Sequence, residues 1–82
     1  MIEDRYLVYG RSSCPFCLMA VNYLTAQNRE FYFFDYPEGS AFLQEAKEFY
    51  SFETVPVIVE NNLNTGETRI VGGYTDLLDW PR

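Results

Sequence analysis

Two cysteines separated by two residues are the most chemically informative feature of this 82-residue chain, which has no other cysteine and no histidine. Cys14 and Cys17 enclose Pro15 and Phe16, and at this spacing one thiol can attack a disulfide while the other resolves the mixed disulfide. The alternatives are half of a zinc site, a structural disulfide or two ordinary core residues. Structural zinc needs four ligands, so the pair predicts redox chemistry instead.

The expected position of Cys14 at the start of a helix would activate its thiol. Residues 5–9 are β-branched and aromatic, as expected of a strand that enters a functional loop. Pro15 suits the first helical position, which places Cys14 at the helix N-terminus, where unpaired N–H groups lower a thiol pKa. Cys17, one turn further in, would be more buried and suited to resolution, and Arg11 would favour a Cys14 thiolate.

The rest of the chain predicts a short alternation of strands and helices. The first helix should place Cys17, Ala20, Val21 and Leu24 on one face and stop at Asn28. The other expected elements are a strand at 31–34 covered on both sides, a helix from the N-cap Ser40 to about Ser51, hairpin strands at 57–59 and 68–71 with a turn at 64–66, and a short helix at 74–80.

This order of elements predicts an α/β domain with a small mixed sheet and helices on its faces. The first helix is a crossover between two strands, which implies a right-handed parallel pair, and the last two strands form an antiparallel hairpin. Eighty-two residues are enough for one domain with a lean core and too few for two.

The charge of the chain argues against two classes of partner. The net charge is −6, and the six basic residues are scattered along the sequence, so nucleic acid and membrane surfaces are not expected partners. The sequence contains no leader pattern and no apolar run of bilayer length, which makes the cytosol the expected compartment. Cysteines in a reducing cytosol are seldom structural staples.

Two further segments carry weaker signals on their own. Thr54-Val55-Pro56 opens the third strand, where proline is tolerated, and a cis Val55–Pro56 bond would leave the Val55 backbone free to pair with an extended substrate. Gly72-Gly73-Tyr74-Thr75-Asp76 combines a turn with a helix start whose N–H groups can bind a carboxylate. Taken alone, the first segment is more often a plain strand start and the second a plain turn.

In this order and on these elements, the three segments resemble a dithiol glutaredoxin of the thioredoxin-like superfamily over nearly the whole chain. The resemblance implies a single domain at 1–82 with the thioredoxin-like (glutaredoxin) fold, a four-stranded mixed sheet in the order 2-1-3-4 flanked by about three helices. It also implies a monomeric enzyme without a tightly bound cofactor or metal. Such an enzyme reduces protein disulfides and glutathione mixed disulfides with glutathione as co-substrate, and ribonucleotide reductase is a candidate client by analogy.

The resemblance also assigns roles to individual residues. Cys14 would attack and Cys17 would resolve. Glutathione would place its glycine carboxylate at Arg11, its cysteinyl portion on the Val55 main chain and its γ-glutamyl end at residues 74–76. The full expected glutathione site is Arg11, Phe16, Thr54, Val55, Pro56, Gly73, Tyr74, Thr75 and Asp76.

One departure from the family pattern keeps alternatives open. Phe52 and Glu53 precede Thr54, where family members often have a basic or amide residue, and an acidic Glu53 pointing into the groove would weaken glutathione binding. A rival reading therefore keeps the chemistry but takes electrons from thioredoxin reductase. A dimer holding an iron-sulfur cluster is disfavoured by Pro15, because cluster binders of the family usually lack that proline. A purely structural protein would leave the Cys14 pKa unshifted.

Overall fold

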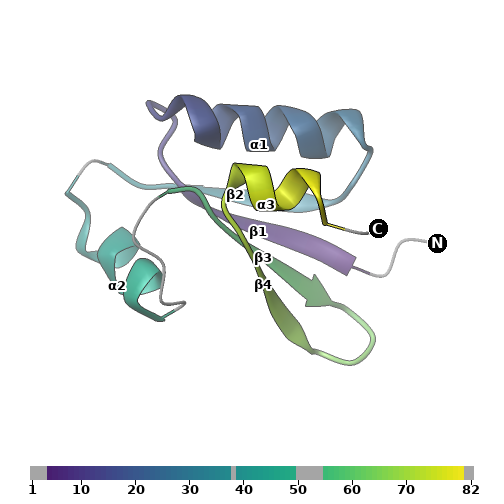
Figure 1. The fold of residues 1–82 in the computed structure, drawn as a ribbon. Helices are drawn as coiled ribbons and strands as arrows, with labels where there is room; N and C mark the ends of the chain where they lie inside the picture. The colour runs from purple at the N-terminus through teal and green to yellow at the C-terminus, as the bar shows by residue number, and fades with distance from the viewer. Residues whose placement is uncertain (1–3, 38, 50–54, 81–82) are drawn as a thin grey trace.

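The described strands form a four-stranded mixed sheet in the order β2-β1-β3-β4 (Figure 1). The computed structural model describes residues 4–37, 39–49 and 55–80. β1 pairs with β2 in parallel and with β3 antiparallel, and β3 pairs antiparallel with β4, which confirms the predicted order 2-1-3-4. The strands are β1 Asp4–Gly10, β2 Phe31–Asp35, β3 Val57–Asn62 and β4 Thr68–Gly72.

Three helices flank the sheet within the described part of the chain: α1 Pro15–Ala26, α2 Ala41–Phe49 and α3 Tyr74–Leu78. α1 and α3 lie side by side over one face, whereas α2 lies on the other side, near the end where β1 leads into α1 (Figure 1). None of the described helices is both long and apolar enough to cross a bilayer.

α1 begins and ends at the residues that the sequence predicts. Cys14 is the N-cap with extended backbone angles, and Pro15 occupies the first turn. The helix stops because Asn28 adopts a positive φ of 56°, after which the Arg29 N–H donates to the Leu24 carbonyl at 3.0 Å. The buried face consists of Cys17, Ala20 and Leu24, as predicted, whereas Val21, which the sequence predicts on the same face, is half-buried.

The core lies between the sheet and the α1–α3 layer. Its residues come from five elements, so it fixes the helices against the strands. Burial of each large aliphatic side chain contributes about 1.5–3 kcal/mol. Trp80 packs against this cluster, with the Arg69 guanidinium 5.3 Å from its ring. The buried members are Tyr6, Val8, Ala20, Leu24, Ile58, Val71 and Leu77.

The prediction that β2 is covered on both sides is wrong. Tyr32 is 50% exposed and Phe34 is 37% exposed, while the alternate side chains pack against the core. The physical reason is position: β2 is an edge strand, and α2 lies against β1 instead of covering β2. On this open face the Arg5 guanidinium lies 5.6 Å from the Tyr32 ring, and Tyr9 stacks on Phe34.

The C-terminal half differs from the prediction only in its boundaries. β3 continues to Asn62, where the side-chain oxygen accepts the N–H groups of Asn64 and Thr65 at 2.9 and 3.0 Å and so shapes the turn. α3 ends at Leu78, before the predicted limit at Trp80. The Ser40 carbonyl accepts the first α2 hydrogen bond, as an N-cap should; the predicted α2 end at Ser51 lies outside the described residues.

Candidate active site

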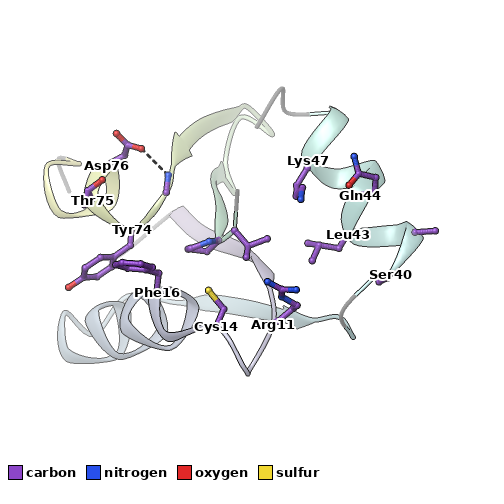
Figure 2. Close-up of a pocket in the computed structure, with 15 residues that line it drawn as sticks. Arg11, Cys14, Phe16, Ser40, Leu43, Gln44, Lys47, Tyr74, Thr75 and Asp76 are labelled. Atoms are coloured by element: carbon purple, nitrogen blue, oxygen red, sulfur yellow. Dashed lines mark hydrogen bonds between the residues drawn. The ribbon is translucent and has the colours of Figure 1, made fainter. Parts of the chain in front are cut away.

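A groove of about 1010 Å³ opens above Cys14, between α2 and the segment that leads into α3 (Figure 2). It forms where the carboxyl end of β1 meets the start of β3, because Tyr9 and Val57 are paired there. The groove therefore gathers residues that are far apart in the sequence. Of the predicted site residues, it is lined by Arg11, Cys14, Phe16, Val55, Pro56, Gly73, Tyr74, Thr75 and Asp76.

Cys14 is half-buried in the groove, and its thiol is activated by the helix that it begins. Burial raises its pKa, but other interactions outweigh this effect. The backbone N–H groups of Cys17 and Phe16 and the Cys17 thiol favour the thiolate and lower the pKa, and Arg11 adds a positive charge. The pKa of Cys14 therefore lies below its ordinary value, so more of this residue is thiolate at neutral pH than in an unperturbed cysteine.

Cys17 lies behind Cys14, fully buried and outside the groove lining. Burial, followed by the hydrogen bond and charge of Cys14, raises the pKa of Cys17 to about 11. Gly10 makes room for it: a Cβ at Gly10 would overlap the Cys17 sulfur. The sequence motif does not reveal this requirement, because a glycine at a strand end also fits an ordinary turn.

An aromatic pair forms the α3 side of the groove beside Cys14. Phe16 is 55% exposed, and its ring centroid lies 6.3 Å from that of Tyr74 at a tilt of 37° (Figure 2). The pair forms an apolar surface beside the Cys14 thiol, against which the apolar part of a bound peptide can pack.

The floor of the groove includes the segment before β3. The Val55–Pro56 bond is cis, as predicted, and Pro56 is buried while Val55 is half-buried. Thr54, which is part of the predicted glutathione site, lies outside the described residues, as do Phe52 and Glu53.

The turn into α3 is held by a side chain of the helix itself. The Asp76 carboxylate accepts the Gly73 N–H at 2.9 Å, shown as the dashed line in Figure 2. Gly72 adopts a positive φ of 119°, and a Cβ there would overlap the same carboxylate. This close approach explains the glycine at position 72, where the sequence indicates only a turn.

The sequence analysis did not identify the α2 wall of the groove. Ser40, Leu43, Gln44 and Lys47 all line it, and Figure 2 shows them opposite Phe16 and Tyr74. The signal that was available is spacing: Lys47 follows the buried Leu43 by one helical turn, so the cation shares the inward-facing side of an amphipathic helix.

Among the described residues, no group of three or more His, Cys, Asp or Glu side chains is arranged to hold a metal ion. The chemistry that these residues support directly is that of the two thiols. The described arrangement can attack a disulfide with the Cys14 sulfur, which lines the groove, and resolve the product with the buried Cys17 sulfur.

Comparison with known proteins gives consistent results. A protein-family model described as Glutaredoxin matches residues 7–63. No curated protein sequence matches the chain. Three solved structures share its fold at 20% identity: wheat glutaredoxin (TM-score 0.67, covering 90% of this chain and 68% of that one), glutaredoxin 1 from Francisella tularensis (0.62, 93% and 90%), and a thioredoxin-fold protein from Helicobacter pylori (0.58, 88% and 60%).

Proposed function

The chain belongs to the glutaredoxin family, a family of thiol–disulfide oxidoreductases, and we propose that it reduces protein disulfides and glutathione mixed disulfides through Cys14 and Cys17 with glutathione as reductant. The observation that carries the proposal is the opposite shift of the two pKa values. Cys14 has a lowered pKa in an open groove, and Cys17 has a raised pKa directly behind it. Cys14 is thus suited to attack the disulfide first, and Cys17 is suited to react in the later, resolving step.

The first step is attack by the Cys14 thiolate on one sulfur of the client disulfide. The client S–S bond breaks, a Cys14–client disulfide forms, and the client's second sulfur leaves as a thiolate that takes up a proton. In this mixed disulfide Cys14 no longer carries a charge. Burial still raises the Cys17 pKa, but the repulsion from the Cys14 thiolate is gone, so the Cys17 proton is lost more easily at the moment when it must leave.

The second step is attack by the Cys17 thiolate on the Cys14 sulfur. This releases the client's remaining thiolate and leaves a Cys14–Cys17 disulfide, so two electrons have passed to the client. One glutathione then opens the Cys14–Cys17 bond at Cys14, and a second glutathione releases glutathione disulfide and restores both thiols. The groove walls around Cys14 support a role in holding the tripeptide during these two exchanges.

The test is a deglutathionylation assay with glutathione and its NADPH-dependent reductase. Cys14→Ser is expected to be inactive, while Cys17→Ser keeps activity on glutathione mixed disulfides and loses most activity on protein disulfides. A Cys14→Ser variant as active as the parent would remove the proposal. A parallel assay with thioredoxin reductase tests the rival electron source, and turnover only with that enzyme would replace glutathione in the scheme.

The client, the compartment and the assembly state are further parts of the proposal. By analogy within the family, ribonucleotide reductase is the proposed protein client, the reducing cytosol the proposed compartment and the monomer the proposed state. Reduction of an oxidised ribonucleotide reductase by the purified protein tests the client. Failure there, with an active deglutathionylation assay, would leave the redox function intact and remove this client.

A further inference from the structure

The turn between β1 and α1 is bound on both sides of Arg11 by the end of β2. β1 ends at Gly10 and β2 ends at Asp35, and these two residues are partners in the parallel register. The Tyr36 N–H donates to the Gly10 carbonyl at 2.9 Å, and the Asp35 carboxylate accepts the Ser12 N–H at 2.8 Å. The two neighbours of Arg11 in the chain are therefore both hydrogen-bonded to the end of β2.

The same turn places Cys14 at the start of α1. The Cys14 N–H donates to the Arg11 carbonyl at 3.1 Å, so Ser12 and Ser13 are the two central residues of a turn that ends at the N-cap. Arg11 and Cys14 both line the groove, and the Arg11 charge favours the Cys14 thiolate (Figure 2). A shift of this turn would move both the cation and the first helical N–H groups relative to the sulfur.

Asp35 lies outside the groove lining, and its side chain is exposed. Its link to the turn is a hydrogen bond between a carboxylate and a backbone N–H, a charge-assisted type that is stronger than a bond between neutral groups. The bond joins residues 23 positions apart in the sequence. Asp35 can therefore act on the thiol only through the turn that it holds.

We infer that Asp35 is a positioning residue for thiol–disulfide exchange, which holds residues 11–13 so that Cys14 keeps its reactive arrangement with Arg11 and the start of α1. This inference rests on the proposed function and extends it to a residue at the end of β2. One net hydrogen bond changes a conformational population by about two- to tenfold. Loss of the Asp35 bond should therefore lower the fraction of molecules in which the cation and the helix start favour the thiolate.

The test compares Asp35→Ala with Asp35→Asn in the reduced full chain. Both variants remove the negative charge, but only asparagine keeps a side-chain oxygen that can accept the Ser12 N–H. Mass spectrometry follows alkylation of Cys14 by iodoacetamide as the pH is varied. We expect Asp35→Ala to react about two- to fivefold more slowly than Asp35→Asn at pH 7, with its pH midpoint displaced upward. Both variants leave in place the other titratable and charged groups around this thiol, which are Arg11, Cys17, Lys47, Tyr74 and Asp76.

Ser12→Pro tests the other partner of the bond. Proline removes the N–H and is favoured at the first central position of a turn, so the turn itself is kept. In the Ser12→Pro background, Asp35→Ala and Asp35→Asn should react at equal rates, because the donor is gone. Glu30→Ala is the matched charge control, since it removes a carboxylate just before the other end of β2 and should leave the Cys14 rate unchanged.

The outcomes separate the inference from the proposed function. Equal alkylation rates for Asp35→Ala and Asp35→Asn in the otherwise unsubstituted chain would overturn the inference and leave the redox function standing. An alanine variant that is less stable in urea but keeps the pH midpoint of the asparagine variant would also overturn it, since the bond would then serve only the fold. If Cys14 of the parent formed no adduct with glutathione disulfide, the proposed function would fail, and the inference with it.

Discussion

Cys14 and Cys17 have the same side chain, but their thiols differ in pKa because they lie three residues apart at the start of α1, in two different environments. Cys14 stands before the first turn, where N–H groups and the charge of Arg11 reach its sulfur. Cys17 stands on the buried face, where low polarity opposes ionisation. The order of reaction thus follows from helix geometry, because the half-buried Cys14 thiol ionises before the fully buried Cys17 thiol.

The Cys14 environment predicts its alkylation profile. In the reduced protein, the pH midpoint for alkylation of Cys14 should lie below that of a model thiol, and Cys17 should react only toward pH 11. Arg11→Gln should slow Cys14 alkylation at pH 7 by about two- to fivefold, because it removes a nearby positive charge. Rates are measured by mass spectrometry, with Arg5→Gln as control. Equal rates in the Arg11→Gln variant and the parent would contradict the assigned effect of Arg11.

Gly10 predicts a steric effect on the resolving thiol. A Cβ at Gly10 overlaps the sulfur of Cys17, which is fully buried. Gly10→Ala should lower the free energy of unfolding by about 1–3 kcal/mol, as overpacking does in other cores. The control is a double-mutant cycle with Cys17→Ala, in which removal of the sulfur should relieve most of that loss. Additive effects in urea unfolding would show that the sulfur is not the obstacle.

At the scale of elements, the ends of α1 could be predicted from local signals and the exposure of β2 could not. Pro15 and Asn28 specify a start and a stop through their own backbone preferences, so no distant contact is needed. Whether Tyr32 and Phe34 are buried depends on what lies over them, and that is decided by where α2 packs. A run of aromatic residues in the sequence does not show whether its strand is an exposed edge strand or a covered one.

The turn into α3 predicts a difference between two glycine substitutions. Gly66 and Gly72 both have positive φ, but Gly66 has open space around its Cα and Gly72 faces the Asp76 carboxylate. Each substitution by alanine should cost about 1–2 kcal/mol for the backbone conformation. Gly72→Ala should cost more, because it also displaces the carboxylate that accepts the Gly73 N–H. Equal losses in urea unfolding would show that the Asp76 contact contributes nothing.

At the scale of the whole molecule, a buried polar cluster ties β1, β3 and β4 together at the end away from Cys14. Glu60 is 3% exposed; it accepts the Tyr6 hydroxyl at 3.3 Å and pairs with Arg69. Arg29, at the end of α1, donates to the same hydroxyl at 3.2 Å. The cluster joins the sheet to the helix layer through charge and hydrogen bonds where the apolar core ends.

Glu60 predicts a loss of stability in acid. Burial raises its pKa, but the hydrogen bonds and the positive charge of Arg69 outweigh this and hold the pKa below its ordinary value. Because the folded pKa is lowered, the stabilisation is present above the unfolded pKa of about 4.3 and is lost as pH falls through the folded value.

Glu60→Gln tests this linkage. The variant should be less stable by about 1–3 kcal/mol at pH 7, because a charged acceptor of Arg69 is lost, and its stability should fall less between pH 5 and acid than that of the parent. Chemical unfolding across this pH range measures both effects. Glu48→Gln, at an exposed position on α2, is the control and should match the parent. Parallel curves for the parent and Glu60→Gln would assign the acid sensitivity to other groups.

The strand order followed from the family resemblance, and most of the groove could be predicted because Cys14, Pro56 and Gly73 each stand at an element boundary at the same end of the sheet. The position of Lys47 in the groove wall could not be predicted, because it depends on where α2 packs. Lys47 also counted as one of six scattered cations in the sequence. The topology of the sheet brings the residues at element boundaries together, whereas tertiary contacts decide which face of a helix lines the groove.

Trp80 is placed so that its fluorescence can report whether the protein is folded. It is the single tryptophan of the chain, packed on the core and beneath the Arg69 guanidinium, at the end of the sheet away from the two sulfurs. Intrinsic fluorescence excited at the indole should therefore change when the polypeptide unfolds and stay nearly constant when Cys14 and Cys17 are oxidised. Optical titrations can then measure conformational stability in either redox state without an added dye.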